Sequence, residues 1–491
     1  MALRLPARPV MPAWEAAVLV AGVGLAMSAG WLVAHPGGVR VALVGAAALG
    51  TLGLGVLAPR ALLYVLIPWL AVLGLVRRVV AQPTAGSSID PLLVIGPVII
   101  VFAFLLAVRS GALARPSLLG KAVGALALLS VVEAFNPLQG SLRTGLAGLA
   151  FLLVPLLMFW VGRALCDDAT LGRVGALVGG LAVVAALYGL YQNFSHFPSW
   201  DLTWIRTAGY AALSVGGTVR AFSSFSSAQE YALFVAMGMG AWFARRAGPV
   251  RTPLTVAALG LCGVALFYES SRSVLIVVLL AAGLVVAARL KVPVGVGALV
   301  GVLFAGALLV LAAHLSAGAP TRATSSELAA HQLQGLGDPL GATSSTLRQH
   351  LSLGGRGLRS ALTDPLGLGT GSVTIAASKF GGSSAGTELD PSNVAVAFGI
   401  PGVLAFVMVL GAGFLQAYRV AVRRQDAVSR VALFFLAVTV FQWLNGGLYS
   451  VAALVWLVLG WVDAASARPP AAEAGSPDAE PDVLALAGAR P

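Results

Sequence analysis

The chain alternates between long apolar stretches and short charged connections. A helix that crosses a bilayer needs about 17–25 mostly apolar residues, and fourteen stretches approach this length. Several are short, and the last two meet at Asn445-Gly446-Gly447, so twelve or thirteen spans also fit. We therefore predict an all-α, polytopic transmembrane helix bundle of about 12–14 spans, with a long extracytoplasmic loop that carries short helices. The candidate spans are 14–34, 40–58, 61–76, 91–108, 121–135, 145–163, 174–192, 228–244, 252–269, 273–288, 293–314, 392–417, 431–446 and 448–463.

Composition supports a membrane protein, because 58% of the residues are hydrophobic and only 10% are charged. Soluble domains carry about 25% charged residues, so composition excludes a water-soluble enzyme, a disordered chain and a disulfide-stapled domain. The 59 glycines fit helices that pack closely in lipid. Cys166 and Cys262 have neither metal-site spacing nor a disulfide pattern, and we expect them to be packing residues.

The formal net charge of +12 indicates membrane orientation rather than nucleic-acid binding, because most Lys and Arg lie in short connections between apolar runs. With the N-terminus in the cytoplasm, every short cytoplasmic loop is positively charged, as the positive-inside rule requires. The pair Arg77-Arg78 falls on the outer side in this topology and is the clearest exception to that rule. Arg4 and Arg8 precede an apolar run that lacks a small-residue cleavage site, which predicts a retained signal anchor. We therefore predict a multi-pass protein with both termini in the cytoplasm.

Two predicted outer segments are too long to be simple connectors, and such segments are usually functional or disordered. The first is aromatic and polar, and the second is rich in Ser, Gly and Thr. The predicted organisation is N-terminal transmembrane helices at 1–192, an outer loop at 193–227, central transmembrane helices at 228–314, a large extracytoplasmic loop at 315–391, C-terminal transmembrane helices at 392–463 and a disordered cytoplasmic tail at 464–491.

The sequence Ser270-Ser271-Arg272-Ser273 opens one of the predicted helices from the outer side. Arg272 opposes the positive-inside bias and also stands at a helix N-terminus, where the helix dipole disfavours a cation. A bound phosphate would remove both objections, because free N–H groups and the guanidinium fork favour one there. The alternative is an interfacial arginine that reaches for water beside serine caps or pairs with Glu269.

A second motif of the same kind, Arg220-Ala221-Phe222-Ser223-Ser224-Phe225-Ser226-Ser227, leads into the helix at 228–244. Two such motifs on one face suggest a shared anionic ligand. Glu230 and Glu133 lie in apolar runs, where an unpaired charge costs several kcal/mol. One interpretation is that they neutralise these arginines.

The large outer loop adds basic residues and a glycine run. Arg348 precedes Asp364-Pro365-Leu366-Gly367-Leu368-Gly369-Thr370-Gly371-Ser372, which is not a P-loop because no Gly-Lys-Ser/Thr follows. We interpret the run as a flexible turn that allows a close backbone approach.

Polar residues stand at the entrance of the helix that contains Gly399-Ile400-Pro401-Gly402. These are Glu388, Asp390, Ser392 and Asn393, and we expect the carboxylates to face the arginines. A carboxylate beside a phosphate clamp can act as a general base. Capping of the helix by Asp390 or Ser392 is the alternative.

Other chemistries lack support in the sequence. The five histidines have no paired metal-ligand spacing, and neither a Walker motif, a Gly-x-Ser-x-Gly elbow nor a dinucleotide fingerprint is present. We expect no metal and no cofactor.

The order of these motifs over roughly 200–415 resembles the O-antigen ligase and Wzy-type polysaccharide polymerase superfamily. The resemblance implies a metal-independent inverting glycosyltransferase of the GT-C type in the bacterial cytoplasmic membrane. By position, Arg220 and Arg272 match family arginines that hold the donor diphosphate, and Arg348 matches a basic residue of the long periplasmic loop. The hallmark His-Asn of the ligases falls here on Glu388 and Leu389, so the histidine is absent. Asp390 or Asn393 can take its place if the helix entrance is one turn shorter.

The resemblance also implies the partners. These are an undecaprenyl-diphosphate-linked glycan donor, a glycan or lipid-core acceptor, membrane lipids and a chain-length regulator protein, with no nucleic acid. The missing histidine favours a polymerase. The alternatives are an O-antigen ligase that uses a lipid or protein acceptor, a transporter or flippase for lipid-linked glycan, and a structural membrane scaffold.

Overall fold

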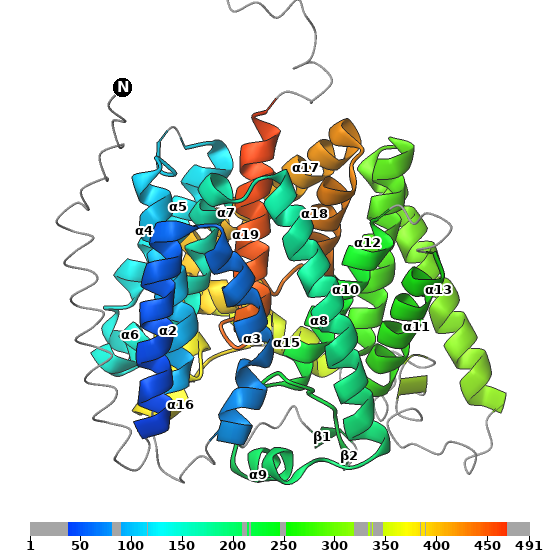
Figure 1. Ribbon diagram of the computed structural model, residues 1–491, viewed down its shortest axis with the longest axis horizontal. Helices are drawn as coiled ribbons and strands as arrows, with labels where there is room; N and C mark the ends of the chain where they lie inside the picture. The colour runs from blue at the N-terminus through cyan, green and yellow to red at the C-terminus, as the bar shows by residue number, and fades with distance from the viewer. Residues whose placement is uncertain are drawn as a thin grey trace, which may run out of the picture.

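The computed structural model describes residues 38–80, 90–114, 116–208, 214–215, 218–245, 252–318, 332–333, 336, 347–382, 384–387 and 389–468. Over these residues the chain forms a bundle of helices that run between two ends (Figure 1). Ten of the described helices are long and apolar enough to cross a membrane. The prediction of an all-α polytopic bundle is therefore confirmed, whereas the predicted span at 14–34 lies outside the described residues.

The described helices follow the apolar runs of the sequence. α5, α10 and α18 are apolar but shorter than a full span, and α6 continues as α7 through one crossing. The helices of the bundle are α2 (Gly38–Leu57), α3 (Ala61–Val80), α4 (Ile95–Arg109), α5 (Leu118–Glu133), α6 (Leu142–Leu156), α7 (Met158–Leu165), α8 (Asp168–Phe194), α10 (Ala228–Phe243), α11 (Thr252–Glu269), α12 (Arg272–Leu290), α13 (Val294–Gly318), α17 (Asp390–Arg424), α18 (Ala427–Val438) and α19 (Tyr449–Ser466).

The remaining described elements include those drawn lowest in Figure 1. They include α9 and a two-residue antiparallel hairpin between α8 and α10. These elements are η1 (Pro91–Val94), η2 (Pro137–Gln139), α9 (Ser199–Ala208), β1 (Ser214–Val215), β2 (Thr218–Val219), α15 (Leu347–Thr363), η4 (Thr370–Val373) and α16 (Ala376–Phe380).

α19 forms the centre of the bundle, with 83% of its spanning window buried (Figure 1). It is apolar on all sides, which is typical of a helix enclosed by other helices. α7 approaches it so closely that a Cβ atom on Gly460 would lie 1.8 Å from the carbonyl oxygen of Phe159. Small residues at such crossings let backbones approach in lipid.

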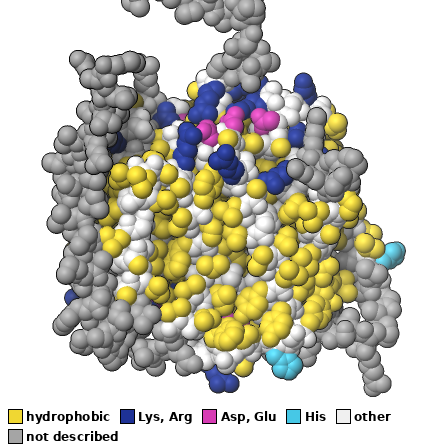
Figure 2. All heavy atoms as spheres, viewed as in Figure 1, with side chains coloured by type: hydrophobic (Ala, Val, Ile, Leu, Met, Phe, Trp, Pro, Cys, Tyr) yellow, Lys and Arg dark blue, Asp and Glu magenta, His cyan; other side chains and the backbone are white. Residues whose placement is uncertain are grey.

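The outside of the bundle has the distribution expected of a membrane protein. Hydrophobic side chains cover the middle of the face in Figure 2, and most of its charged side chains gather at the upper edge. α13 is an example of a helix at the outside of the bundle, because only 17% of its spanning window is buried. The chain is therefore a multi-pass membrane protein.

The predicted span at 431–446 is corrected by the structure. α18 ends at Val438, and residues 439–448 form turns inside the bundle before α19 begins. Irregular backbone at membrane depth is tolerated where protein surrounds it. Trp443 and Leu444 are buried here, and Asp390 Oδ2 accepts a hydrogen bond of 2.8 Å from the Leu444 amide.

α17 is broken at Gly399, where φ is 59° and ψ is −150°. The carbonyls of Val396 and Ala397 cannot continue the helix and instead accept hydrogen bonds from the amides of Leu368 (2.8 Å) and Gly369 (3.2 Å). The expected close backbone approach of the glycine run is therefore present. It packs against this break rather than forming an isolated turn.

Substitution of Gly399 by Ala is expected to destabilise the bundle. The new Cβ would lie 2.0 Å from the Pro365 carbonyl oxygen at a backbone conformation that L residues rarely adopt. We expect a loss of about 2 kcal/mol in unfolding free energy, measured as a lower thermal midpoint in detergent. Gly411→Ala, on the same helix with nothing within 4 Å of the added Cβ, should leave the midpoint unchanged or raise it. Equal midpoints for the two variants would contradict this account.

Candidate functional site

Arg220 joins the two arginine motifs of the sequence. It lies directly after β2, and its Nε donates to the backbone carbonyl of Glu269 (3.0 Å). Its Nη2 donates to the Glu269 carboxylate and to Ser271 Oγ, the latter at 3.0 Å. Arg272, the next residue, begins α12. The structure thus brings Arg220 against the residue that precedes Arg272.

Glu269 ends α11 and its side chain is fully buried. The ion pair shown for this carboxylate is with Arg220, so the structure differs from the alternative in which Glu269 pairs with Arg272. Ser270 follows in the left-handed conformation, with φ of 69°, and its Oγ donates to Gln332 Oε1 at 3.3 Å.

The serine-rich part of the first motif is held by an ion pair that the sequence analysis missed. Arg78 Nε lies 2.7 Å from Asp201 Oδ1, and both side chains are fully buried. The Arg78 guanidinium also donates to the carbonyls of Ser223 (2.5 Å) and Phe225 (2.6 Å). The turn at 223–225 is therefore attached to α3.

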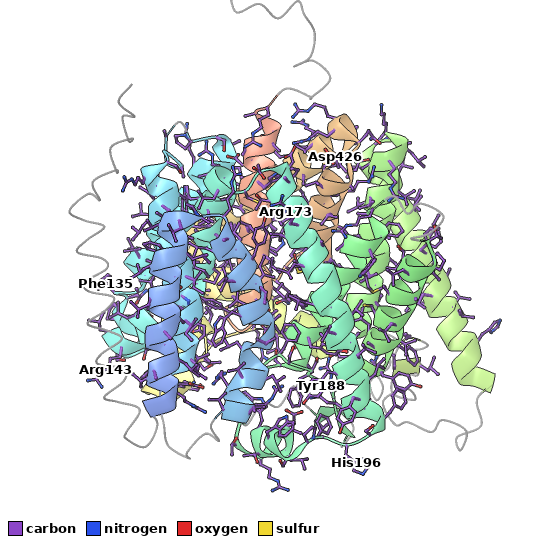
Figure 3. All side chains as sticks on the ribbon, in the orientation of Figure 1. Phe135, Arg143, Arg173, Tyr188, His196 and Asp426 are labelled. Atoms are coloured by element: carbon purple, nitrogen blue, oxygen red, sulfur yellow. The ribbon has the colours of Figure 1, made fainter. Side chains whose placement is uncertain are left out.

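Asp201 belongs to a wider polar network at this end, where Figure 3 labels Tyr188. Its Oδ2 accepts hydrogen bonds from Tyr188 Oη (2.7 Å) and Gln192 Nε2 (2.8 Å). Gln192 Oε1 in turn accepts from the Ser223 amide at 2.7 Å. The only sequence signal for this network was that Arg77-Arg78 opposes the positive-inside bias. The buried ion pair with Asp201 explains why Arg78 occupies this position.

A second cationic group lies beside it. Asp90 accepts from Arg77 Nε at 2.7 Å and lies 3.3 Å from Arg40 Nη1. The Arg77 guanidinium stacks over the ring of Trp204 at 5.0 Å. Burial lowers the pKa of Lys379, in α16, below its usual value; nearby Arg77 lowers it further and Asp90 raises it. The two clusters place basic residues from α2, α3, α12, α16 and the 218–220 segment at one end of the bundle.

Strained backbone marks the same segments. In the described chain, five residues other than glycine have positive φ, and Lys291 and Gln425 among them are ordinary left-handed helix C-caps. The other three are Ser223 (50°), Ser270 (69°) and Phe441 (69°). Such strain persists where surrounding contacts fix it, and it concentrates at functional sites. The carbonyl of Phe441 accepts from the Asp390 amide at 2.9 Å.

The entrance of α17 differs from the sequence prediction in its details. Asp390 is fully buried and takes no part in the ion pairs of the described residues. Its Oδ2 bonds the Leu444 amide, and its Oδ1 has no partner among the described residues. Leu389 occupies the N-cap without a side-chain bond, so the alternative in which Asp390 or Ser392 caps the helix is wrong.

The other candidate residues at this entrance are placed only in part. Asn393 is half-buried, and its Oδ1 accepts from the amide (2.6 Å) and the hydroxyl (2.9 Å) of Thr387. Glu388 lies outside the described residues. Arg348 stands in the first turn of α15, which packs on this entrance where Gly357 meets Ser392.

The two acidic residues of the apolar runs do not pair with the motif arginines. Glu230 Oε1 accepts from the amide (3.0 Å) and the hydroxyl (2.7 Å) of Ser450 at the start of α19. Glu133 accepts from Asn136 Nδ2 at 2.7 Å. Both therefore bind groups at helix ends, which corrects the interpretation that they neutralise these arginines.

Comparison with known proteins gives no assignment: no family model matches the chain, and neither does any curated protein. In the part of the chain that the structure describes, no three His, Cys, Asp or Glu side chains are grouped as metal ligands.

Replacing Arg78 by Gln is expected to cost about 3–5 kcal/mol of stability, because it leaves Asp201 buried without its cation. Asp201→Asn should cost a similar amount, and each variant should lower the thermal midpoint in detergent. The matched control is Arg60→Gln, which breaks the 2.8 Å pair with Asp167 where 59% of the arginine side chain is exposed. An exposed pair contributes about 0–1 kcal/mol, so equal effects at Arg60 and Arg78 would contradict the role of the buried pair.

Proposed function

We propose that the chain is an integral membrane inverting glycosyltransferase, and a polysaccharide polymerase in preference to a ligase. It transfers a glycan from an undecaprenyl-diphosphate carrier to a saccharide acceptor. The observation that carries the proposal is the meeting of the two arginine motifs at Glu269 and Ser271, beside backbone strained at Ser223 and Ser270. Within the proposal, Arg220, Arg272 and Arg348 hold the diphosphate.

The chemistry requires no nucleotide. The acceptor hydroxyl attacks the anomeric carbon, the new glycosidic C–O bond forms and the bond to the diphosphate breaks. The diphosphate leaves with the electron pair, and Arg220, which is held by Glu269 and Ser271, stabilises with Arg272 and Arg348 the charge that develops on it. A carboxylate takes the hydroxyl proton, and Asp390 is assigned this role because its Oδ1 has no partner among the described residues.

Membrane orientation is part of the proposal. Ion pairs at the upper end join Arg60 to Asp167, Arg163 to Asp463 and Arg424 to Asp168, and all three arginines lie at connections that are cytoplasmic when the N-terminus is cytoplasmic. We assign this end to the cytoplasm of a bacterium. The end with Arg220, α9 and α15 then faces outward, and both termini are cytoplasmic. The partners are the lipid-linked donor, the saccharide acceptor and a chain-length regulator.

Arginine substitutions test the diphosphate assignment. Arg220→Ala and Arg272→Ala are expected to lower glycan transfer about 10²- to 10³-fold, because each removes a charge partner of the leaving group. Arg220→Lys and Arg272→Lys should keep part of the activity, measured with purified protein and lipid-diphosphate-linked glycan. Arg206→Ala, an exposed arginine of α9, is the control. Unchanged transfer in both Ala variants would refute the diphosphate role.

Asp390→Asn tests the proton acceptor. The amide oxygen can still accept from the Leu444 amide, so folding should persist while transfer falls by about 10²- to 10⁴-fold. Asp364→Asn, in the glycine run, is the control and should keep transfer. Full activity of a folded Asp390→Asn variant assigns the proton transfer to another group.

Analysis of the surface glycan after gene deletion distinguishes the alternatives. Single repeat units indicate a polymerase, and long chains left on the carrier indicate a ligase. Movement of lipid-linked glycan across sealed vesicles without new glycosidic bonds would indicate a transporter. Normal glycan after substitution of all the outer arginines together would indicate a scaffold.

A further inference from the structure

A basic cavity lies at the opposite end of the bundle from Arg220. It has a volume of about 780 Å³ and opens between α17 and the connection from α12 to α13. Lys291, Arg419 and Arg423 contribute three cations to its lining, and the lining contains no acidic side chain. Valine and proline side chains from both elements complete the wall, so the cavity is amphipathic.

Hydrogen bonds hold the two walls of this basic cavity together. Tyr418 Oη donates to the Val292 carbonyl at 2.5 Å, and Gln425 Nε2 donates to the Ala288 carbonyl at 2.7 Å. Lys291 occupies the left-handed C-cap of α12, where its amide bonds the last turn. The geometry of the cavity is therefore fixed by the protein without a ligand.

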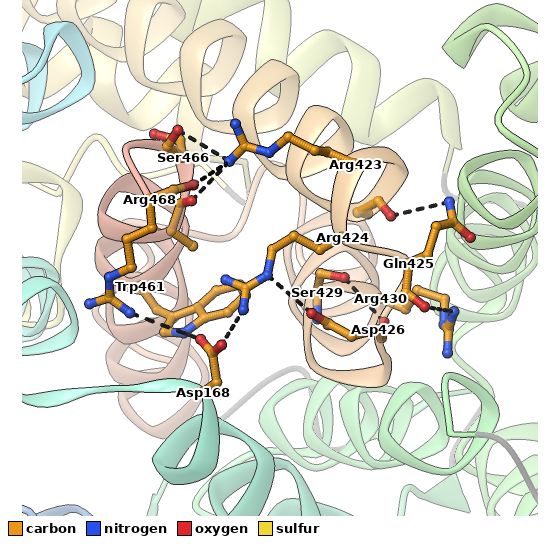
Figure 4. Close-up of polar contacts among 12 residues, drawn as sticks. Asp168, Arg423, Arg424, Gln425, Asp426, Ser429, Arg430, Trp461, Ser466 and Arg468 are labelled. Carbon is orange, nitrogen blue, oxygen red and sulfur yellow. Dashed lines mark hydrogen bonds and ion pairs between the residues drawn. The ribbon is translucent and has the colours of Figure 1, made fainter. Parts of the chain in front are cut away.

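Among the described residues, no acidic side chain pairs with Lys291 or Arg419 of the basic cavity. Several other arginines at this end form ion pairs, as Arg424 does with Asp168 and Asp426 (Figure 4). Lys291 and Arg419 are exposed and have no ion pair with the described residues. Arg423, one helical turn from Arg419, donates to the carbonyls at the end of α19 (Figure 4). The cavity therefore favours an anion.

The basic cavity also contains a neutral polar side chain that can bind a ligand. Gln416 lines the basic cavity, and its Oε1 is buried without a partner among the described residues. A buried acceptor of this kind is normally satisfied by a donor. A ligand that carries both a phosphate and a hydroxyl group meets both requirements.

We propose that the basic cavity binds the headgroup of an anionic phospholipid that carries a free hydroxyl, of the phosphatidylglycerol type. The phosphodiester lies against Lys291 and Arg419, and the headgroup hydroxyl donates to Gln416. The acyl chains follow the apolar surface of α17, where Leu415 is 46% exposed. Basic pockets between membrane helices commonly bind anionic headgroups in this way. The site is independent of the proposed glycan transfer.

Native mass spectrometry of the full chain tests the proposal with phosphatidylglycerol and phosphatidylcholine added in equal amounts. We expect wild-type protein to retain phosphatidylglycerol selectively, and affinity to fall about fivefold for each cation removed in Lys291→Gln and Arg419→Gln. Arg419→Lys should keep most of the selectivity, and Gln416→Leu should lower the preference for phosphatidylglycerol over phosphatidic acid. The matched control is Arg173→Gln, an exposed arginine at the same end that does not line the cavity (Figure 3).

Gel filtration of each variant shows that it is folded before lipid is added. Equal phosphatidylglycerol retention by wild type and by the Lys291→Gln, Arg419→Gln double variant would overturn the proposal. A loss of the same size in Arg173→Gln would also overturn it, because the effect would then be general to surface charge. Displacement of the lipid by millimolar inorganic phosphate would identify a free anion as the ligand instead.

Discussion

The buried ion pair between Arg78 and Asp201 is the interaction on which the candidate site depends. Two charges removed from water are tolerated only when their geometry and additional hydrogen bonds compensate for the lost hydration. Here the remaining donors of Arg78 bind the carbonyls of Ser223 and Phe225, and Asp201 accepts from Tyr188 and Gln192. The same contacts therefore compensate the two buried charges and hold the 223–225 turn in position.

That turn connects the two parts of the candidate site. Its N-terminal side leads back to Arg220, which binds Glu269 and Ser271, and its C-terminal side leads to Ser227, which caps α10. Glu230, in the first turn of α10, binds the start of α19 through Ser450. One short segment therefore links the arginine cluster to the central helix of the bundle.

The helices were predictable because the length and apolar character of each run are sufficient to indicate a membrane helix. A window of apolar residues favours a membrane helix largely independently of the rest of the chain, and the runs from 40–58 to 448–463 overlap described helices, although 431–446 continues past the end of α18. The early end of α18 was not predictable, because it depends on a bond from Leu444 to Asp390, far away in the sequence. The ion-pair partner of Glu269 could not be predicted from the sequence either, because Arg220 and Arg272 are both basic. Only the fold shows that Arg220 is the partner. Arg78 opposes the positive-inside bias, but the sequence does not identify its partner, because Asp201 lies in a segment without a recognisable motif.

The central position of α19 has a consequence for how the protein is made. Translation reaches this helix only after all the other described helices have been synthesised, yet they enclose it on nearly every side. Until it arrives, the earlier helices surround an unfilled interior, and the crossing of Gly162 with Leu457 cannot form. Insertion of α18 and α19, the last described helices, is thus the event that fills the middle of the bundle and completes its assembly.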